Sequence, residues 1–177
     1  RRSEVYEDGS LRVRFPNGEV LEAVVVNTAG GIAGGDRFTF DVDVAAGAEL
    51  TVTTAAAEKA YRAIGEPATM DVKLSVAAGG SLVWLPQETI LFNEAELKRS
   101  IEVDLSADAK LMLAESVVFG RTAMDETVVQ GSLIDRWRVR RDGKLIFADT
   151  LKLEGEIAQK LALKRSEEHT SELQSRL

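Results

Sequence analysis

Carboxylates and backbone groups are the parts of this sequence that could carry chemistry, because the usual nucleophiles and metal ligands are scarce. The chain has no cysteine, which removes disulfides, thiol nucleophiles and thiolate metal sites together. Its one histidine, His169, lies in a C-terminal tail that differs from the rest of the chain. Side-chain metal ligands in the remainder are therefore expected to be oxygen atoms.

The densest group of carboxylates surrounds Gly120, in residues 115–126 (ESVVFGRTAMDE). The charged members of this group are Glu115, Arg121, Asp125 and Glu126. Carboxylates this close in sequence could share a cation or act as an acid/base pair. A solvated loop held by an ion pair is the more common outcome for such a segment, and both interpretations stay open.

An enzyme that hydrolyses polysaccharide through paired carboxylates is the alternative to a binding protein. Without a nucleophile or a histidine in the main part of the chain, hydrolysis would need the two-carboxylate arrangement of glycosidases. Such enzymes usually line a groove with several exposed aromatics, whereas this chain is only 6% aromatic, and most of its aromatic residues alternate inward. We therefore expect a binding or scaffolding protein that is not an enzyme.

The most unusual motif is glycine-rich and spans residues 27–36 (NTAGGIAGGD), beginning at Asn27 and ending at Asp36. Its glycines are Gly30, Gly31, Gly34 and Gly35. No Gly-Lys-Ser/Thr follows, and a strand rather than a helix comes next, so a phosphate-binding loop is not expected. The backbone is free to adopt positive φ or to let another chain approach closely. From the motif alone, the favoured structure is a tight β-corner capped by Asp36.

Composition places the chain among single-domain proteins without a membrane span. The 177 residues carry a formal net charge of −7, and scattered Lys and Arg predict neither a nucleic-acid nor a membrane partner. No run of about 18 apolar residues exists, so we expect a soluble, cytoplasmic protein. Residues 166–177 (SEEHTSELQSRL) resemble translated adapter sequence and are interpreted as a non-native tail, which leaves residues 1–165 as one β-rich domain.

The elements that must position these groups are predicted to be strands, because apolar and polar residues alternate with a period of two. The clearest examples are residues 11–15, 38–44, 70–76 and 101–105. Asp142-Gly143 predicts a tight type I′ hairpin. Helix signals are limited to residues 55–62, which could equally be strand and loop, and to two turns within 156–163.

A weak internal repeat suggests how the strands are arranged. Gly47, Gly79 and Asp108 occupy equivalent turn positions, 32 and then 29 residues apart, and such periods are typical of stacked units. The alternative is that any all-β protein has similar hairpins. We predict an all-β fold of stacked antiparallel layers, like a β-helix or solenoid, with one or two short helices. The segments after each unit (54–61, 86–92 and 115–126) should then lie along one edge.

Five ordered motifs together resemble the urease accessory protein UreD family, also called UreH. They are residues 27–36 (NTAGGIAGGD), 54–62 (TAAAEKAYR), 85–92 (LPQETILF), 120–126 (GRTAMDE) and 135–149 (DRWRVRRDGKLIFAD). The resemblance runs from about residue 3 to residue 163. Family members begin earlier and continue further, so we expect this chain to be truncated at both ends. Asp125 stands where the family usually has glycine.

The resemblance implies an all-β scaffold that is not catalytic. Such a protein binds apo-urease, together with the partners UreF and the GTPase UreG, and supports nickel insertion into the urease active site. Nickel is expected to pass through or along it, with no tightly bound cofactor. The glycine loop (residues 27–36) and the pair Gly120 and Arg121 are the expected partner contacts, and Gly31→Val is expected to block a close approach by the partner.

Nickel chemistry narrows the role of this chain in transfer. Ni²⁺ is held best by imidazole and thiolate ligands, while carboxylate and carbonyl oxygens bind it more weakly. A domain without His or Cys is therefore a poor nickel store, but weak oxygen sites suit transit. The expected transient ligands are Asp36, Glu88, Glu115 and Glu126.

Overall fold

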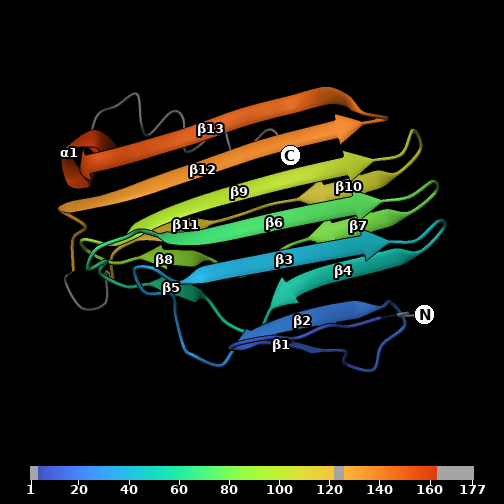
Figure 1. The fold of residues 1–177 in the computed structure, drawn as a ribbon, viewed down its shortest axis with the longest axis horizontal. Helices are drawn as coiled ribbons and strands as arrows, with labels where there is room; N and C mark the ends of the chain where they lie inside the picture. Colours follow the sequence, from blue (N-terminus) through green and yellow to red (C-terminus); the bar gives the residue numbers. More distant parts are fainter. Residues whose placement is uncertain (1–3, 122–125, 163–177) are drawn as a thin grey trace.

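Three β-sheets account for almost all of the regular structure in the computed structural model, which describes residues 4–121 and 126–162 (Figure 1). The long sheet has the order β13 (Lys144–Glu156), β12 (Gln130–Arg141), β9 (Glu96–Leu105), β6 (Ala68–Val76) and β3 (Arg37–Val44). The facing sheet has the order β1 (Leu11–Arg14), β2 (Glu22–Asn27), β4 (Glu49–Thr54), β7 (Ser81–Trp84) and β10 (Lys110–Leu113). The short sheet has the order β11 (Val117–Phe119), β8 (Thr89–Leu91) and β5 (Glu58–Ala60).

Each coil of the chain contributes one strand to each sheet, so the coils stack as a solenoid. The strands β3, β4 and β5 form one coil, β6, β7 and β8 the next, and β9, β10 and β11 a third. Val42 pairs with Leu74, and Leu74 pairs with Val103. These pairings reproduce the predicted offsets of 32 and 29 residues, and the all-β, solenoid-like prediction is confirmed.

The turns between the long and facing sheets also stack as the repeat predicts. Gly47 and Gly79 both have a φ of 65°, a conformation that glycine adopts without strain. The Gly47 N–H donates to the Ala78 carbonyl at 2.9 Å. The Gly79 N–H donates to Asp108 Oδ1 at 2.8 Å. The Asp108 side chain therefore links the third turn to the second.

The direction of pairing differs from the prediction, because successive coils pair in parallel rather than antiparallel. Every pairing between coils in the three sheets is parallel, and among the described strands only β1–β2 and β12–β13 are antiparallel. The pairing is parallel because each coil returns to the same sheet in the same direction. The sequence did not reveal this, because strands alternate with a period of two in parallel and antiparallel sheets alike. The predicted hairpin joins β12 to β13, with φ of 46° at Asp142 and 74° at Gly143.

The segments that follow each unit are gathered as predicted, and they form a sheet rather than a simple edge. Residues 54–61, 86–92 and 115–126 supply β5, β8 and β11, the strands of the short sheet. Residues 55–62 contain no helix. The second helix signal is confirmed by α1 (Ile157–Leu161), whose Ile157 is fully buried.

The core lies between the sheets and is filled by inward-facing aliphatic side chains. Leu74, Leu82, Ile101, Val103 and Leu133 are all buried. One row across the long sheet breaks this pattern, because Phe38 and Met70 are followed in register by Arg99 and Asp135. The interior therefore changes from apolar to charged along this row.

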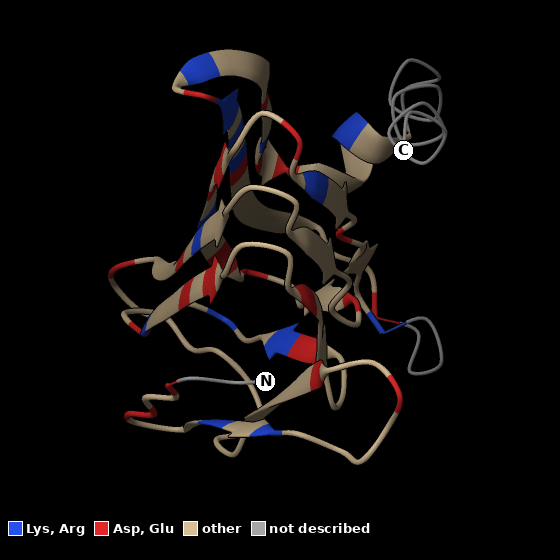
Figure 2. Ribbon diagram, turned by 90° about the vertical axis from the view of Figure 1, so that its right-hand side faces the viewer, with Lys and Arg blue, Asp and Glu red and all other residues tan. Residues whose placement is uncertain are grey.

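The outward surfaces carry mixed charge. Figure 2 shows Lys and Arg interspersed with Asp and Glu along the strands and turns. In the described part of the chain, no helix is long and apolar enough to cross a membrane.

Candidate functional site

A buried ion cluster lies where the charged row of the long sheet meets the end of the facing sheet. The Arg99 side chain is only 1% exposed. Its Nε and Nη2 donate to Asp135 Oδ1 and Oδ2 at 3.0 and 2.5 Å, and its Nη1 pairs with Glu115 Oε2. Arg99 therefore bridges two carboxylates inside the solenoid.

Parallel stacking explains how these residues meet. Arg99 on β9 and Asp135 on β12 are direct partners in register, so their side chains leave the sheet on the same face. Glu115 follows β10, the last strand of the facing sheet. The three residues are therefore brought together by the coiling of the chain and not by closeness in sequence.

Two indole groups complete the cluster. Trp84 Nε1 donates to Glu115 Oε1 at 2.8 Å, and Trp137 Nε1 donates to Asp135 Oδ1 at 3.0 Å. Each carboxylate thus accepts from both a guanidinium and an indole. Among the described residues, no buried side-chain nitrogen or oxygen lacks a hydrogen-bond partner, as the cost of burying polar groups requires.

The cluster holds two carboxyl groups and a single guanidinium. Burial raises the pKa of Glu115, although the charge of Arg99 and the Trp84 hydrogen bond act in the opposite direction. Burial disfavours the Arg99 cation, but the two carboxylates outweigh this effect and raise its pKa.

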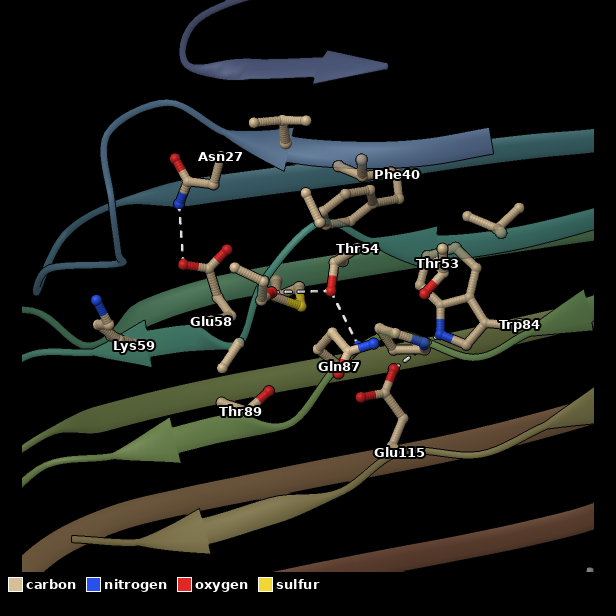
Figure 3. Close-up of a pocket in the computed structure, with 18 of the residues that line it drawn as sticks. Asn27, Phe40, Thr53, Thr54, Glu58, Lys59, Trp84, Gln87, Thr89 and Glu115 are labelled. Atoms are coloured by element: carbon tan, nitrogen blue, oxygen red, sulfur yellow. Dashed lines mark hydrogen bonds between the residues drawn. The ribbon is translucent and has the colours of Figure 1, made fainter. Parts of the chain in front are cut away.

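A cavity of about 140 Å³ adjoins the cluster and is lined by both Arg99 and Glu115. Its polar lining also includes Thr54, Glu58 and Gln87. In the view of Figure 3, Thr54 and Gln87 lie between the carboxylates of Glu58 and Glu115. The cavity therefore presents oxygen atoms from several coils.

Glu58 is held at the cavity by Asn27, the first residue of the glycine motif. Asn27 Nδ2 donates to Glu58 Oε1 at 2.9 Å and also to the Gly31 carbonyl at 2.9 Å. Burial raises the pKa of Glu58, although the Asn27 hydrogen bond partly offsets this effect. Asn27 therefore links the glycine motif to the lining of the cavity.

The glycines of the motif are needed for contacts within the chain. A Cβ atom at Gly31 would lie 2.7 Å from the Lys59 carbonyl oxygen and even closer to the Tyr61 ring. The Ile32 N–H donates to the Lys59 carbonyl at 2.7 Å, and the Tyr61 N–H donates to the Ile32 carbonyl at 2.8 Å. The close approach expected for Gly31 is therefore made by its own chain, alongside β5.

The predicted corner capped by Asp36 is confirmed. The Ala33 N–H donates to Asp36 Oδ2 at 2.8 Å, and the Asp36 N–H donates back to the Ala33 carbonyl at 3.0 Å. Gly30 and Gly35 have φ of 77° and 84°, while a Cβ at Gly34 would lie 2.8 Å from Ala63 Cα. The Asp36 carboxylate is thus engaged in closing the loop.

The group around Gly120 forms an ion pair at the short sheet. Arg121 Nε donates to Glu126 Oε2 at 2.7 Å, and the Arg121 guanidinium lies 4.4 Å from the centre of the Phe92 ring. The Arg121 hydrogen bond holds the pKa of Glu126 below its usual value. Asp125, the remaining carboxylate of the predicted group, lies outside the described residues.

The four predicted nickel ligands are not gathered into one site. Of them, only Glu115 lines the cavity, while Asp36 and Glu126 are engaged elsewhere and Glu88 is absent from the lining. Within residues 4–121 and 126–162, no group of three or more His, Asp or Glu residues is arranged to hold a metal ion. The described residues therefore offer a metal ion only weak oxygen ligands that lie apart from one another.

Sequence reasoning missed Arg99, Asp135 and Glu58 as members of the site. A signal for the first was present, since Arg99 continues the inward alternation of Leu97 and Ile101 on β9. Asp135 likewise follows the buried Leu133 at a spacing of two. A charged residue at an inward position of a strand marks a buried polar cluster, because such a residue needs a partner.

The fold and site define a β-solenoid protein whose apolar core contains one buried ion cluster. The adjoining cavity is lined mainly by apolar side chains, with a few polar and charged residues among them. The family model described as UreD urease accessory protein matches residues 1–170. The chain belongs to this family.

Relatives of this chain are named as urease accessory proteins of this family. The chain is 60% identical over 160 residues to a urease accessory protein UreD of Rhodopseudomonas palustris (strain ATCC BAA-98 / CGA009), which covers 89% of this chain and 57% of the relative. It is 56% identical over 164 residues to urease accessory protein UreD 3 of Bradyrhizobium sp. (strain BTAi1 / ATCC BAA-1182), covering 92% and 59%. The chain therefore spans less than two thirds of the length of these relatives.

Proposed function

We propose that this chain acts as a non-catalytic scaffold in urease maturation, binding apo-urease together with UreF-type and UreG-type accessory proteins. In this role it supports insertion of nickel into the urease active site, in the cytoplasm. The names of the relatives support the urease link, and the acidic chain with dispersed basic residues fits neither nucleic acid nor membrane as a partner.

The observation that carries the nickel role is the interior cavity lined by Glu58 and Glu115. Carboxylate oxygens bind Ni²⁺ more weakly than imidazole or thiolate, and passage requires sites that bind and then release. Glu115 is the predicted ligand that the fold brings to the cavity, and Glu58 adds a second carboxylate. Nickel is the cargo of this protein and is not a resident cofactor.

A carbohydrate enzyme with paired carboxylates fits these residues poorly. Glu115 is tied to Arg99 and Trp84, so it is not free to protonate a glycosidic oxygen. Glu126, the other described carboxylate of this group, is engaged by Arg121. The accessory role needs no such pair.

The test of this function is Glu115→Gln in a cell-based urease activation assay with the partner proteins present. We expect nickel content and urease activity to fall by about tenfold, the scale of losing one charged ligand interaction. Glu102→Gln is the matched control, because Glu102 is a half-exposed carboxylate that pairs with Arg140 on the long sheet at 2.9 Å. Full activation by a folded Glu115→Gln variant would exclude the cavity as the nickel route.

A further inference from the structure

We propose that Arg99 keeps the interior a place of cation passage rather than storage, because its guanidinium occupies the position between Glu115 and Asp135 that a divalent cation would take. The role in passage rests on the proposed function. The position of the guanidinium between the two carboxylates is independent of the proposed function, since it concerns only these three side chains. Arg99 is thus a positioning residue that sets the cation affinity of the interior.

The geometry of the cluster supports this role. Arg99 contacts one carboxylate with Nε and Nη2 and the other with Nη1, so it lies between them as a bridging cation would. The two carboxylates also accept hydrogen bonds from the indole N–H groups of Trp84 and Trp137. Without Arg99, two carboxylates would face each other across a space the size of a guanidinium group.

The charge balance points the same way. When both carboxylates are ionised, one guanidinium leaves the group with a net charge of −1, whereas a divalent cation in the same place would neutralise them. Removing one partner of a buried ion pair is strongly destabilising because it leaves uncompensated charge. A variant without the guanidinium should therefore recruit a cation or lose stability.

Access is provided by the cavity. Both Arg99 and Glu115 line it, whereas Asp135 does not. A cation in the cavity would therefore meet Glu115 first, with the Arg99 guanidinium already in contact with that carboxylate. Competition with Arg99 keeps Glu115 a weak ligand, and release remains possible.

The experiment compares thermal unfolding of the wild-type chain and of Arg99→Gln in nickel chloride and in chelator. We expect the variant to be destabilised in chelator and to gain on the order of 5 °C in Tm with saturating nickel. The wild type should show little change with nickel. A purely structural role for Arg99 would instead give a loss of stability that is the same with and without nickel.

Two further variants identify the site. Arg99→Gln combined with Glu115→Gln should lose the nickel-dependent gain, because one of the two carboxylates is gone. Arg140→Gln is the matched control, since Arg140 is a half-exposed arginine that pairs with Glu102 at 2.9 Å, and its Tm should not depend on nickel.

A variant too unstable to purify is assayed by refolding from denaturant with nickel or with chelator. Refolding of Arg99→Gln only with nickel supports the proposal, and equal failure in both conditions overturns it, as does a nickel-independent Tm. None of these measurements uses urease. If nickel rescues Arg99→Gln while Glu115→Gln still activates urease fully, the proposed function fails and this inference stands.

Discussion

At the scale of single residues, Gly31 shows how a motif can serve the chain's own packing. The position of its missing Cβ is filled by the Tyr61 ring and the Lys59 carbonyl oxygen. A side chain here would displace β5, whose Glu58 and Lys59 line the cavity. A loss of urease activation in Gly31→Val would therefore not by itself indicate a lost partner contact, because the substitution would also disturb the fold.

Gly31→Ala should lower the free energy of unfolding by about 1–3 kcal/mol, the usual cost of overpacking, as measured by urea titration. Gly18→Ala is the matched control, because the nearest atom to its Cβ would be the Val20 carbonyl oxygen at an ordinary 3.6 Å. Equal stability of the two variants would contradict the close approach at Gly31.

Glu58 gives a prediction about pH. Burial raises its pKa in the folded protein above the ordinary value of 4.5, so the folded state binds the proton more tightly than the unfolded state. Stability contributed by this group is then full below pH 4.5 and is lost as the pH rises through the raised folded-state pKa.

Glu58→Gln mimics the protonated form, so its stability relative to wild type should increase with pH above about 4.5 and then level off. Urea titrations at several pH values measure this difference. Glu126→Gln provides a control of opposite sign, because Arg121 lowers the pKa of Glu126 and the wild type should lose its advantage as the pH falls. The same pH dependence for both variants would contradict the assignment.

At the scale of elements, the stacked turns hold successive coils in register. Asp108 accepts from the Gly79 N–H at 2.8 Å, and the Gly79 turn in turn lies against Gly47. In the preceding turn, the Gly47 N–H donates to a backbone carbonyl, that of Ala78. At the next turn a side-chain carboxylate accepts instead, because Asp108 stands where the repeat otherwise has glycine. At this third step the side-chain bond is flanked by two backbone bonds, from the Ser106 N–H to the Val76 carbonyl and from the Lys110 N–H to the Gly80 carbonyl, both at 2.9 Å.

Asp108→Ala should lower the free energy of unfolding by about 1 kcal/mol, the usual contribution of one hydrogen bond, as measured by urea titration. Asp71→Ala, which removes an exposed carboxylate on β6, is the control and should change stability by less than about 0.5 kcal/mol. A neutral Asp108→Ala would show that the coils keep their register without this bond.

At the scale of the whole molecule, parallel stacking converts a sequence offset into a spatial column. Residues separated by 32 or 29 positions become neighbours, so a column of inward side chains can change character from coil to coil. The row from Phe38 through Met70 to Arg99 and Asp135 does so. The cavity forms where this change coincides with the short sheet, so the site is a property of the stack and not of any one coil.

The sequence by itself determined which side chains face inward, where the turns fall, and the offset at which units repeat. Alternation, positive-φ glycines and turn residues are local properties, so they can be recognised without knowing the partner of any strand. The repeat of Gly47, Gly79 and Asp108 predicted the register of the coils for the same reason. The ordered motifs also identified the family.

Only the tertiary structure decided the parallel direction of the coils, the meeting of Arg99 with Glu115 and Asp135, and the close contact of Gly31 with Lys59 and Tyr61. These three charged residues are separated by 16 and 36 positions, and no local pattern encodes that they meet. Buried charges have to find partners wherever the stacking places them. Their chemistry is therefore set by the way the coils close around the interior.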